Sequence, residues 1–490
     1  MQYLMIQNFG EAPIEGYTTL GISTTRNSNF SNVIGQFGSG NKQAINVLLR
    51  NKIPTIVFAG KTKLEFYTEK KEIDDGLALQ EYHQVYCKMS GKINESENEK
   101  TVNKQIKLGF TTEYGVQDWT NVAMGLREFV SNAIDRTIRE FDGKFIEQIK
   151  NGNLSIKVVD KNQVRAKTGY TRVFVPFQYE VIDFVATLGK RFLHFSEPEN
   201  VEVKILPKKD RNINGKGAVV YRKGVYVREV ETTDDKPSLY DYNFGDELKI
   251  DECRNVDDYN ARTTIAIAIR NSNSETISGI FQKMINKERI WESSLDSYYL
   301  SADRVWEEEE KKSIKENWNS AWKKVAGDSI MVDALSPNKE ILSKKGHTYI
   351  EIDHPSWTTA AFSNQLEQIS TKVLSKSESA GKVEVPVTEF AIQAVDIVWG
   401  WLEESNMILN KTKPDVRCFQ NIMENESITK GYYEDNVVYL REMDSTGGIT
   451  SDLLQTALEE VVHHITGAGD MSRDIQDFLF QAIVKIKLEK

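Results

Sequence analysis

The segment Leu126-Arg-Glu-Phe-Val-Ser-Asn-Ala-Ile-Asp135 constrains this chain more than any other part of the sequence. Its apolar residues recur at helical spacing, and a helix brings Glu128 and Asn132 to one face because they are one turn apart. A carboxylate there is suited to polarise a water molecule. An amide oxygen there is suited to hold Mg²⁺, which usually brings phosphate groups with it. The segment therefore predicts a helix that carries part of a phosphate-handling site.

A second segment, Ile34-Gly-Gln-Phe-Gly-Ser-Gly-Asn-Lys-Gln-Ala44, is rich in glycine and precedes an apolar-periodic run that predicts a helix. Gly38 and Gly40 permit positive φ and a close approach of the backbone to a ligand. The first N–H groups of the helix and the positive end of its dipole would face phosphates, and Lys42 adds a charge at the same end. A plain flexible turn is the alternative for such a loop alone. The two segments together favour phosphate binding.

Both segments resemble ATP-site motifs of the GHKL superfamily, which includes gyrase B, heat-shock-ninety chaperones, histidine kinases and MutL. The helix is similar to the chaperones' L-R-E-L-I-S-N-A-x-D, and the loop is similar to their I-G-Q-F-G-x-G. The resemblance implies ATP and Mg²⁺ as ligands, Glu128 as the catalytic base, and Asn132 as the Mg²⁺ ligand. The other residues that it assigns to the nucleotide in these two segments are Gly35, Gln36, Gly38, Ser39, Gly40, Asn41, Lys42 and Asp135.

The order of the motifs differs from that of the family, in which the helix precedes the loop. The N-terminal segment Tyr3–Pro13 resembles the family's middle motif, a strand that ends in D-x-G-x-G, with Asn8 at the Asp position, Gly10 at the first glycine and Ala12 at the second. The following Thr18–Phe30 would be the lid over the nucleotide. The resemblance thus implies a circularly permuted GHKL (Bergerat) α/β sandwich, which is feasible where the original termini lie close together.

Two further expectations follow from the same resemblance. The strand Leu154–Val159 should lie in one sheet with the N-terminal strand, so that Asn8 shares a pocket with Glu128 and Asn132. Thr111 or Thr112 resembles the family's strand threonine near the base, with an ordinary polar strand or turn residue as the alternative. Asn8 accepts a hydrogen bond without charge, so adenine specificity is less firmly implied than phosphate binding.

The composition narrows the class of protein. The net charge is −10 and the isoelectric point about 5.4, which argues against nucleic-acid binding. We expect no membrane span, because no apolar run is long enough, and no signal peptide. The three cysteines Cys87, Cys253 and Cys418 are scattered, as in a reducing compartment. We therefore expect a cytoplasmic protein with a protein partner, and a homodimer is one arrangement left open.

The pattern along the chain predicts an α+β multidomain protein. Its expected parts are the permuted ATP domain at 1–176, a second βα domain at 177–290, a helical connector with a small αβ unit at 291–375, and a small C-terminal α/β domain at 376–490. The second part is similar in position to the family's domain that supplies a cation to the γ-phosphate. Candidates for that cation are Arg222, Lys223, Arg254 and Arg262. The alternative for each of them is an ordinary solvated surface charge. Residues expected to pack in the connector are Trp306, Trp318 and Trp322.

The C-terminal part contains Ala457-Leu-Glu-Glu-Val-Val-His-His464 on an amphipathic helix. A zinc peptidase carries H-E-x-x-H in such a helix, and here Glu459 replaces the first histidine, whereas Glu460 and His463 match. The region therefore resembles a zincin-like domain with a degenerate zinc site. We expect those three residues to cluster with one of Asp470, Asp474 or Asp477, and we do not expect tightly held zinc.

Three function classes remain open on the sequence. The first is a Mg²⁺-dependent ATPase that couples nucleotide binding and hydrolysis to domain rearrangement and acts on a protein partner. The second is a metal-dependent peptidase with a regulatory ATP domain. The third is a nucleotide-binding interaction protein without turnover. The presence of Glu128 favours the first, and the replaced histidine disfavours the second.

Overall fold

The computed structural model describes residues 1–21, 33–35, 38–74, 76–95, 98–141, 145–213, 215, 217–230, 236–336, 338–344, 346–376, 382–408, 411–421, 429–468 and 473–488. Gln36, Asp470 and most of the expected lid Thr18–Phe30 lie outside these residues. The chain is an α+β protein with antiparallel and mixed sheets. It forms two compact units, one of residues 1–325 with 353–364 and one of residues 326–352 with 365–490. The division into four domains at the predicted boundaries stays a prediction.

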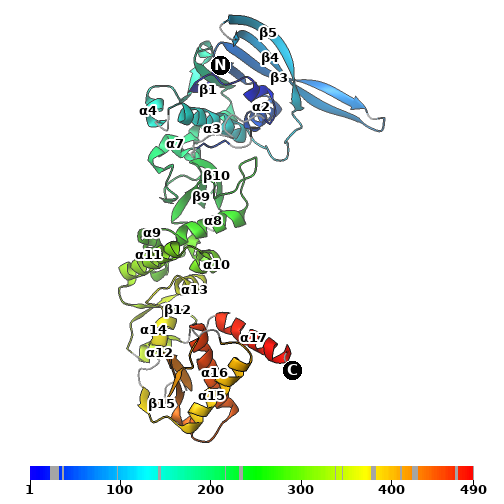
Figure 1. The fold of residues 1–490 in the computed structure, drawn as a ribbon. Coiled ribbons are helices and arrows are strands. Elements are labelled where there is room, and N and C mark those ends of the chain that lie inside the picture. Colours follow the sequence, from blue (N-terminus) through cyan, green and yellow to red (C-terminus); the bar gives the residue numbers. More distant parts are fainter. Residues whose placement is uncertain are drawn as a thin grey trace. The chain divides into compact units, whose positions relative to one another are not determined.

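A seven-stranded antiparallel sheet forms the N-terminal part of the first unit, in the order β5-β4-β3-β2-β7-β1-β6 (Figure 1). Its strands are β1 (Gln2–Phe9), β2 (Ile56–Ala59), β3 (Thr62–Asp74), β4 (Leu79–Glu95), β5 (Asn98–Thr111), β6 (Ser155–Asp160) and β7 (Tyr170–Pro176). The N-terminal strand β1 pairs with both β6 and β7, which come about 150 residues later. The predicted pairing of the N-terminal strand with the strand after the Glu128 helix is therefore confirmed.

Two long helices cover one face of this sheet, α2 (Gly40–Arg50) and α3 (Val122–Glu140), and both were predicted. Asn121 begins α3, because its side chain accepts a hydrogen bond from the N–H of Met124. Alternate residues of β1 and β7 face the helices, as the two-residue repeat of a strand requires. The shared core includes Leu4, Ile6, Ile45, Leu48, Leu126, Phe129, Val130, Val173 and Val175. The helices α1 (Glu15–Thr18) and α4 (Phe145–Lys150) are shorter.

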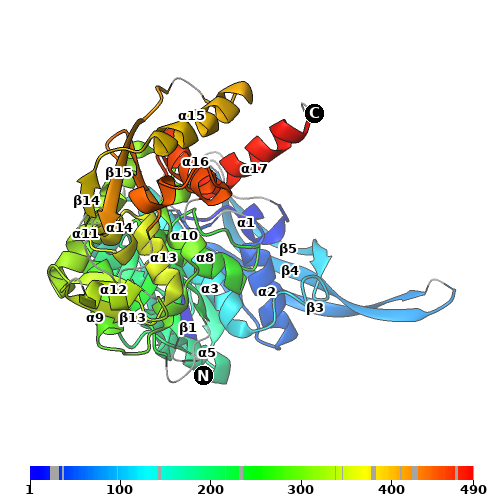
Figure 2. The same cartoon turned by 90° about the horizontal axis from the view of Figure 1, so that it is seen from below.

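The far ends of β3 and β4 form a two-stranded arm that leaves the rest of the sheet (Figures 1 and 2). A second, mixed sheet follows in the first unit. It has the order β10-β9-β11-β8, from β8 (Ile205–Pro207), β9 (Ala218–Arg222), β10 (Val225–Val230) and β11 (Tyr240–Phe244). The short helices α5 (Tyr179–Ala186), α6 (Leu188–Arg191) and α7 (Leu193–Ser196) precede it.

Helices complete the first unit, and aromatic side chains form their core. They are α8 (Asp258–Arg270), α9 (Ser274–Ile285), α10 (Ser297–Leu300), α11 (Glu308–Ala326) and α13 (Pro355–Ser363). Phe281 packs edge-on against Trp318, Trp322 and Trp357, all buried. The packing predicted for Trp318 and Trp322 is confirmed. The prediction for Trp306 is wrong: its side chain is 95% exposed, because it precedes the first turn of α11.

The second unit contains two sheets. The parallel pair β12 (Ile330–Asp333) and β13 (Tyr349–Ile352), joined through α12 (Asn338–Lys344), confirms the predicted strand–helix–strand unit, and α14 (Ser370–Lys376) follows. The larger sheet has the order β14-β15-β17-β16, from β14 (Lys382–Val385), β15 (Asp415–Asn421), β16 (Gly431–Glu434) and β17 (Val437–Arg441). Helices α15 (Glu389–Glu404), α16 (Ser451–Thr466) and α17 (Arg473–Leu488) supply apolar residues to its core. Among the described residues, no helix is long and apolar enough to cross a membrane.

Candidate functional site

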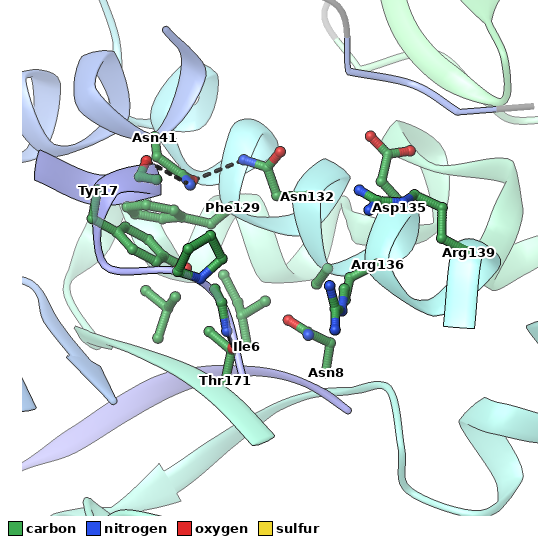
Figure 3. A pocket seen from close by; sticks show the side chains of 15 residues that line it. Ile6, Asn8, Tyr17, Asn41, Phe129, Asn132, Asp135, Arg136, Arg139 and Thr171 are labelled. Atoms are coloured by element: carbon green, nitrogen blue, oxygen red, sulfur yellow. Dashed lines mark hydrogen bonds between the residues drawn. The ribbon is translucent and has the colours of Figure 1, made fainter. Parts of the chain in front are cut away.

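A pocket opens between α3 and the ends of β1 and β7 (Figure 3). Its lining residues are Ile6, Asn8, Ala12, Pro13, Gly16, Tyr17, Asn41, Phe129, Asn132, Ala133, Asp135, Arg136, Arg139, Thr171 and Val173. They come from the N-terminal strand and the segment that follows it, from α3 and from β7, and Asn41 is the one described residue of the glycine-rich segment among them. The pocket thus unites the three segments that the sequence singled out.

Asn132 connects α3 to the glycine-rich segment. Its Nδ2 donates a hydrogen bond of 2.8 Å to Oδ1 of Asn41, in the first turn of α2, and the two amides face each other in Figure 3. Nδ2 of Asn41 in turn donates to the carbonyl oxygen of Gly16 at 3.4 Å. With its amino group engaged, the amide of Asn132 keeps its carbonyl oxygen as an acceptor or metal ligand at the pocket.

Asn8 and Gly10 form the turn that leaves β1. Nδ2 of Asn8 donates to the carbonyl oxygens of Phe9, at 2.8 Å, and Gly10, at 3.5 Å. Gly10 has a φ of +87°, and a Cβ there would lie 2.6 Å from the guanidinium of Arg136. The backbone conformation favours glycine here, whereas the Arg136 side chain is flexible and could move away from a Cβ.

Asp135 fixes the start of the glycine-rich segment. Its carboxylate accepts hydrogen bonds from the backbone N–H groups of Ile34, at 2.6 Å, and Gly35, at 2.7 Å. Burial raises the pKa of the Asp135 carboxyl to about 6, although both N–H groups act in the opposite direction. Asp135 and Gly35 were predicted as nucleotide ligands. In the structure they bind each other, and of the two only Asp135 lines the pocket.

The first turn of α2 has the features of an anion site. Gly38 has a φ of +77°, and its carbonyl oxygen accepts a hydrogen bond of 2.8 Å from Nζ of Lys42. Ser39 occupies the N-cap position without capping the helix, and its buried hydroxyl has no partner within the described residues. Burial lowers the pKa of Lys42 to about 8. Gly40 is the first helical residue, so the N-terminal N–H groups of α2 start here.

Glu128 lies on the side of α3 that faces the start of α2, where a Cβ at Gly40 would be 2.5 Å from its carboxylate. The carboxylate accepts hydrogen bonds from Arg254, at 2.6 Å from Nε and 3.2 Å from Nη2, and lies 3.5 Å from Nε of Arg127. Burial alone would raise the pKa of Glu128, but the charges of Arg254 and Arg127 outweigh it and hold the pKa below its usual value. Glu128 was expected in the pocket with Asn8. Its carboxylate is instead engaged in this buried ion pair.

Two of the four candidate cations reach the glycine-rich segment. Nη1 of Arg254 donates to the carbonyl oxygen of Ile34 at 3.3 Å, and Nζ of Lys223 donates to that of Val33 at 3.0 Å. Lys223 occupies the turn between β9 and β10, and Arg254 the loop between β11 and α8. The other two bind acidic side chains of the second sheet region, Arg222 with Asp246 and Arg262 with Asp258.

The threonine at the pocket is not one of the two that the sequence suggested. Thr111 and Thr112 lie at the end of β5, which is the edge strand farthest from β1, so they cannot serve this pocket. The pocket threonine is Thr171 of β7, whose hydroxyl donates to the carbonyl oxygen of Gly10 and accepts from the N–H of Ala12, both at 2.8 Å. The available signal was the position of Thr171 directly after Gly169-Tyr170, at the start of an apolar strand.

Two arginines on α3 were also missed, Arg136 and Arg139. Helical spacing places them one and two turns after Asn132, so the periodicity used for Glu128 would have found them. They add positive charge to the pocket on the side where Asn8 lies, and Arg136 is also paired with Glu140. Positive charge there suits an anionic or acceptor-rich ligand.

In the described part of the chain, Glu459, Glu460 and His463 do not gather with Asp477, whereas Asp470 and the side chain of Asp474, the other two candidates, lie outside it. Glu459 is exposed and Glu460 is buried, and Nδ1 of His463 is 2.6 Å from the carbonyl oxygen of Ala468. Asp477 is exposed and lies 3.7 Å from Arg473. In the part of the chain that is described, no three His, Cys, Asp or Glu side chains gather as a metal site would require. The reason is geometric, since neighbours on a helix point in different directions.

Comparisons of the chain with protein-family models, with curated proteins and with solved structures find no match.

Proposed function

We propose that this chain is a Mg²⁺-dependent, ATP-binding protein of the GHKL type that hydrolyses ATP and couples the cycle to rearrangement of its parts. In this proposal the seven-stranded sheet with α2 and α3 is a circularly permuted nucleotide domain, and the protein acts on a protein partner. The observation that carries the proposal is the hydrogen bond between Asn41 and Asn132. The two residues are 91 positions apart. They belong to two segments that two separate sequence motifs assign to one nucleotide.

The arrangement of the strands supports the permutation. β1 lies between β6 and β7, so the N-terminal strand occupies a position inside the sheet of the later strands. Asn8, near the end of this strand, lines one pocket with Asn132. A strand that stands first in the sequence and inside the sheet is what a moved chain end would produce.

The phosphate end of the proposed ligand lies at the start of α2. Gly38 admits a close approach of the backbone, Lys42 supplies positive charge, and the hydroxyl of Ser39 is a buried donor. The N-terminal N–H groups of an 11-residue helix add favourable partial charge for an anion. Asn132 would hold the Mg²⁺ through its carbonyl oxygen, and the metal would neutralise the phosphate oxygens.

The base end of the proposed ligand lies near Asn8 and Thr171. The hydroxyl of Thr171 is already used by Gly10 and Ala12, and so it shapes the pocket wall without offering a free donor. The amino group of Asn8 is likewise engaged, so its carbonyl oxygen is the group that would accept a hydrogen bond from a base. This acceptor is uncharged, and the preference for adenine over other bases should therefore be modest.

Calorimetry with ATP, in the presence and absence of Mg²⁺, tests the binding step, with GTP as the comparison. We expect saturable, Mg²⁺-dependent binding of ATP at a ratio of one per chain. Hydrolysis is tested separately with Glu128→Gln, which should bind ATP and hydrolyse it about 10²- to 10⁴-fold more slowly than the wild type, as loss of a general base would cause. A wild-type protein that binds no nucleotide under either condition would refute the proposal.

One observation favours the alternative of nucleotide binding without turnover. The carboxylate of Glu128 is neutralised by an arginine in the present structure, and a carboxylate in that state does not activate water. Saturable ATP binding together with an absence of hydrolysis, with and without candidate partners, would support this alternative. The peptidase reading has no comparable support, because Nδ1 of His463 and both ring nitrogens of His464 are within hydrogen-bond distance of groups of the chain itself.

A further inference from the structure

The strongest unexplained contact near the pocket is the ion pair between Arg254 and Glu128. The two residues are 126 positions apart, and both side chains are only 7% exposed. Nε and Nη2 of the guanidinium bind the two carboxylate oxygens, at 2.6 and 3.2 Å, and Nη1 binds the carbonyl oxygen of Ile34. One arginine thus contacts the proposed base and the glycine-rich segment at the same time.

The loop that carries Arg254 is held in a conformation that presents this side chain. Arg254 has a φ of +60°, in the left-handed region that a branched or long side chain seldom adopts. The N–H of Arg254 donates to the carbonyl oxygen of Asp251, and Nη2 of Arg127 donates to the carbonyl oxygen of Cys253 at 2.7 Å. These neighbouring contacts hold the loop in the conformation that directs the Arg254 side chain to Glu128.

The pair has a chemical consequence for turnover. A carboxylate that is bound on both oxygens by a guanidinium is poorly placed to accept a proton from water. Separating a buried ion pair is costly unless another ion replaces the partner that leaves. The terminal phosphate of a nucleotide bound at Gly38–Lys42 is an anion of the required charge, next to the Ile34 carbonyl that Arg254 already contacts.

We propose that Arg254 is a positioning residue that keeps Glu128 inactive until the phosphate chain of the bound nucleotide takes over its guanidinium. This inference rests on the proposed function, because it requires a phosphate ligand. Through Arg254, the loop after β11 controls whether the base on α3 is free. Nucleotide binding and the arrangement of the second sheet are thereby linked at one side chain.

The charged groups that act on Glu128 come from two elements. Arg127 and Asp135 lie on α3, and Arg254 comes from the loop after β11. Arg254 and Arg127 are the two that lower the pKa of Glu128 against the effect of burial. Removal of Arg254 should therefore raise this pKa in the unliganded protein. The removal of Arg254 should have no such effect in the nucleotide complex, because there the guanidinium has already moved from Glu128 to the phosphate chain.

The test compares two pH profiles of ATP hydrolysis in the wild type and Arg254→Gln. The acid limb of kcat/KM reports the free protein, and that of kcat reports the nucleotide complex. We expect the kcat/KM limb of Arg254→Gln to move to higher pH by about 1–3 units, the usual effect of losing an adjacent opposite charge. The kcat limb should not move. Arg254→Lys, which keeps the charge, should show a smaller shift in the same direction.

Arg262→Gln is the matched control, because Arg262 is paired with Asp258 and should move neither limb. Circular dichroism and a thermal melt establish that each variant is folded, and if Arg254→Gln is not, the shift in Arg254→Lys decides. A shift of both limbs would mean that the ion pair between Arg254 and Glu128 persists in the nucleotide complex, which would overturn the proposed exchange of partners. A shift of neither limb would also overturn it. ATP binding without hydrolysis in both the wild type and Arg254→Gln would overturn only the proposed role of Arg254. Failure of the wild type to bind ATP would overturn the proposed function.

Discussion

The side chain of Asn132, in the middle of α3, donates a 2.8 Å hydrogen bond to that of Asn41, in the first turn of α2. The two helices also share an apolar interface, in which Ile45 and Leu48 pack with Leu126. The apolar contacts hold the helices together, and the amide pair sets their polar ends at one position of the pocket. A ligand that contacts both amides would therefore meet a preformed arrangement.

Asn132→Ala should weaken Mg²⁺-dependent ATP binding while the protein remains folded. It removes the proposed metal ligand, and we expect the affinity to fall tenfold or more, about 1.4 kcal/mol. The lost hydrogen bond to Asn41 should lower the free energy of unfolding by only about 0.5–1.5 kcal/mol. Calorimetry with and without Mg²⁺ separates the two effects, with Asn317→Ala on α11 as a control that should bind normally. Unchanged affinity in a folded Asn132→Ala protein would contradict the metal assignment.

We expect Lys42 to make the proposed ATP binding dependent on pH. Burial lowers its pKa to about 8, so its positive charge is present below that pH and is lost as the pH rises through it. Binding of a phosphate anion favours the charged form. The affinity of the wild type should therefore fall between about pH 7.5 and 9, by roughly tenfold, or about 1.4 kcal/mol.

The matched variant is Lys42→Met, which should bind ATP more weakly at pH 7 and should lack this fall. A second measurement is the uptake of protons on binding, obtained from calorimetry in buffers of different ionisation enthalpy near pH 8. An affinity that is flat across this range in the wild type would mean that Lys42 does not interact with the ligand.

Thr171 and Thr111 offer a matched pair in one sheet. Thr171→Val keeps the shape of the side chain but leaves the carbonyl oxygen of Gly10 and the N–H of Ala12 without the hydroxyl. We expect a loss of about 1–3 kcal/mol in the free energy of unfolding, because these groups are buried, and weaker ATP binding. Thr111→Val, at the far edge of the sheet, should leave ATP affinity unchanged. Equal binding by both variants would show that Thr171 does not shape the site.

The sequence predicted those parts of the site that depend on local spacing. Asn132 and Glu128 share a turn of helix, and Gly38 precedes an amphipathic run, so both elements could be located without a structure. The presence of β1 and β6 in one sheet was also predicted, on the likeness of Tyr3–Pro13 to a strand motif. In each case the informative residues are neighbours in the sequence or belong to one recognisable segment.

The rest depended on contacts between distant segments. Arg254 meets Glu128 from 126 positions away, and nothing in its own neighbourhood distinguishes it from Arg262. The choice of Thr111 over Thr171 failed for a similar reason, because the order of strands in the sheet decides which threonine lies at the pocket. Helical spacing also failed for Trp306, since the helix begins only after it.

The C-terminal unit should hold no stoichiometric zinc. Glu459 is exposed whereas Glu460 is buried, and one imidazole with carboxylates is a poor set of ligands for zinc. Metal analysis of the purified protein should find well under one zinc per chain, in the wild type and in His463→Ala alike. Near-stoichiometric zinc that disappears in His463→Ala would restore the peptidase hypothesis.

His464 should matter for the stability of this unit. Its side chain is only 2% exposed, with Nε2 at 2.8 Å from the carbonyl oxygen of Thr412 and Nδ1 at 3.2 Å from the hydroxyl of Tyr433. His464→Ala would leave the Thr412 carbonyl without this partner, and we expect a loss of about 1–3 kcal/mol in the free energy of unfolding. His347→Ala, at an exposed position of the same unit, should change stability by less than about 0.5 kcal/mol. Denaturant unfolding followed by circular dichroism measures both, and equal stability of the two variants would mean that His464 does not join α16 to the segment around Thr412.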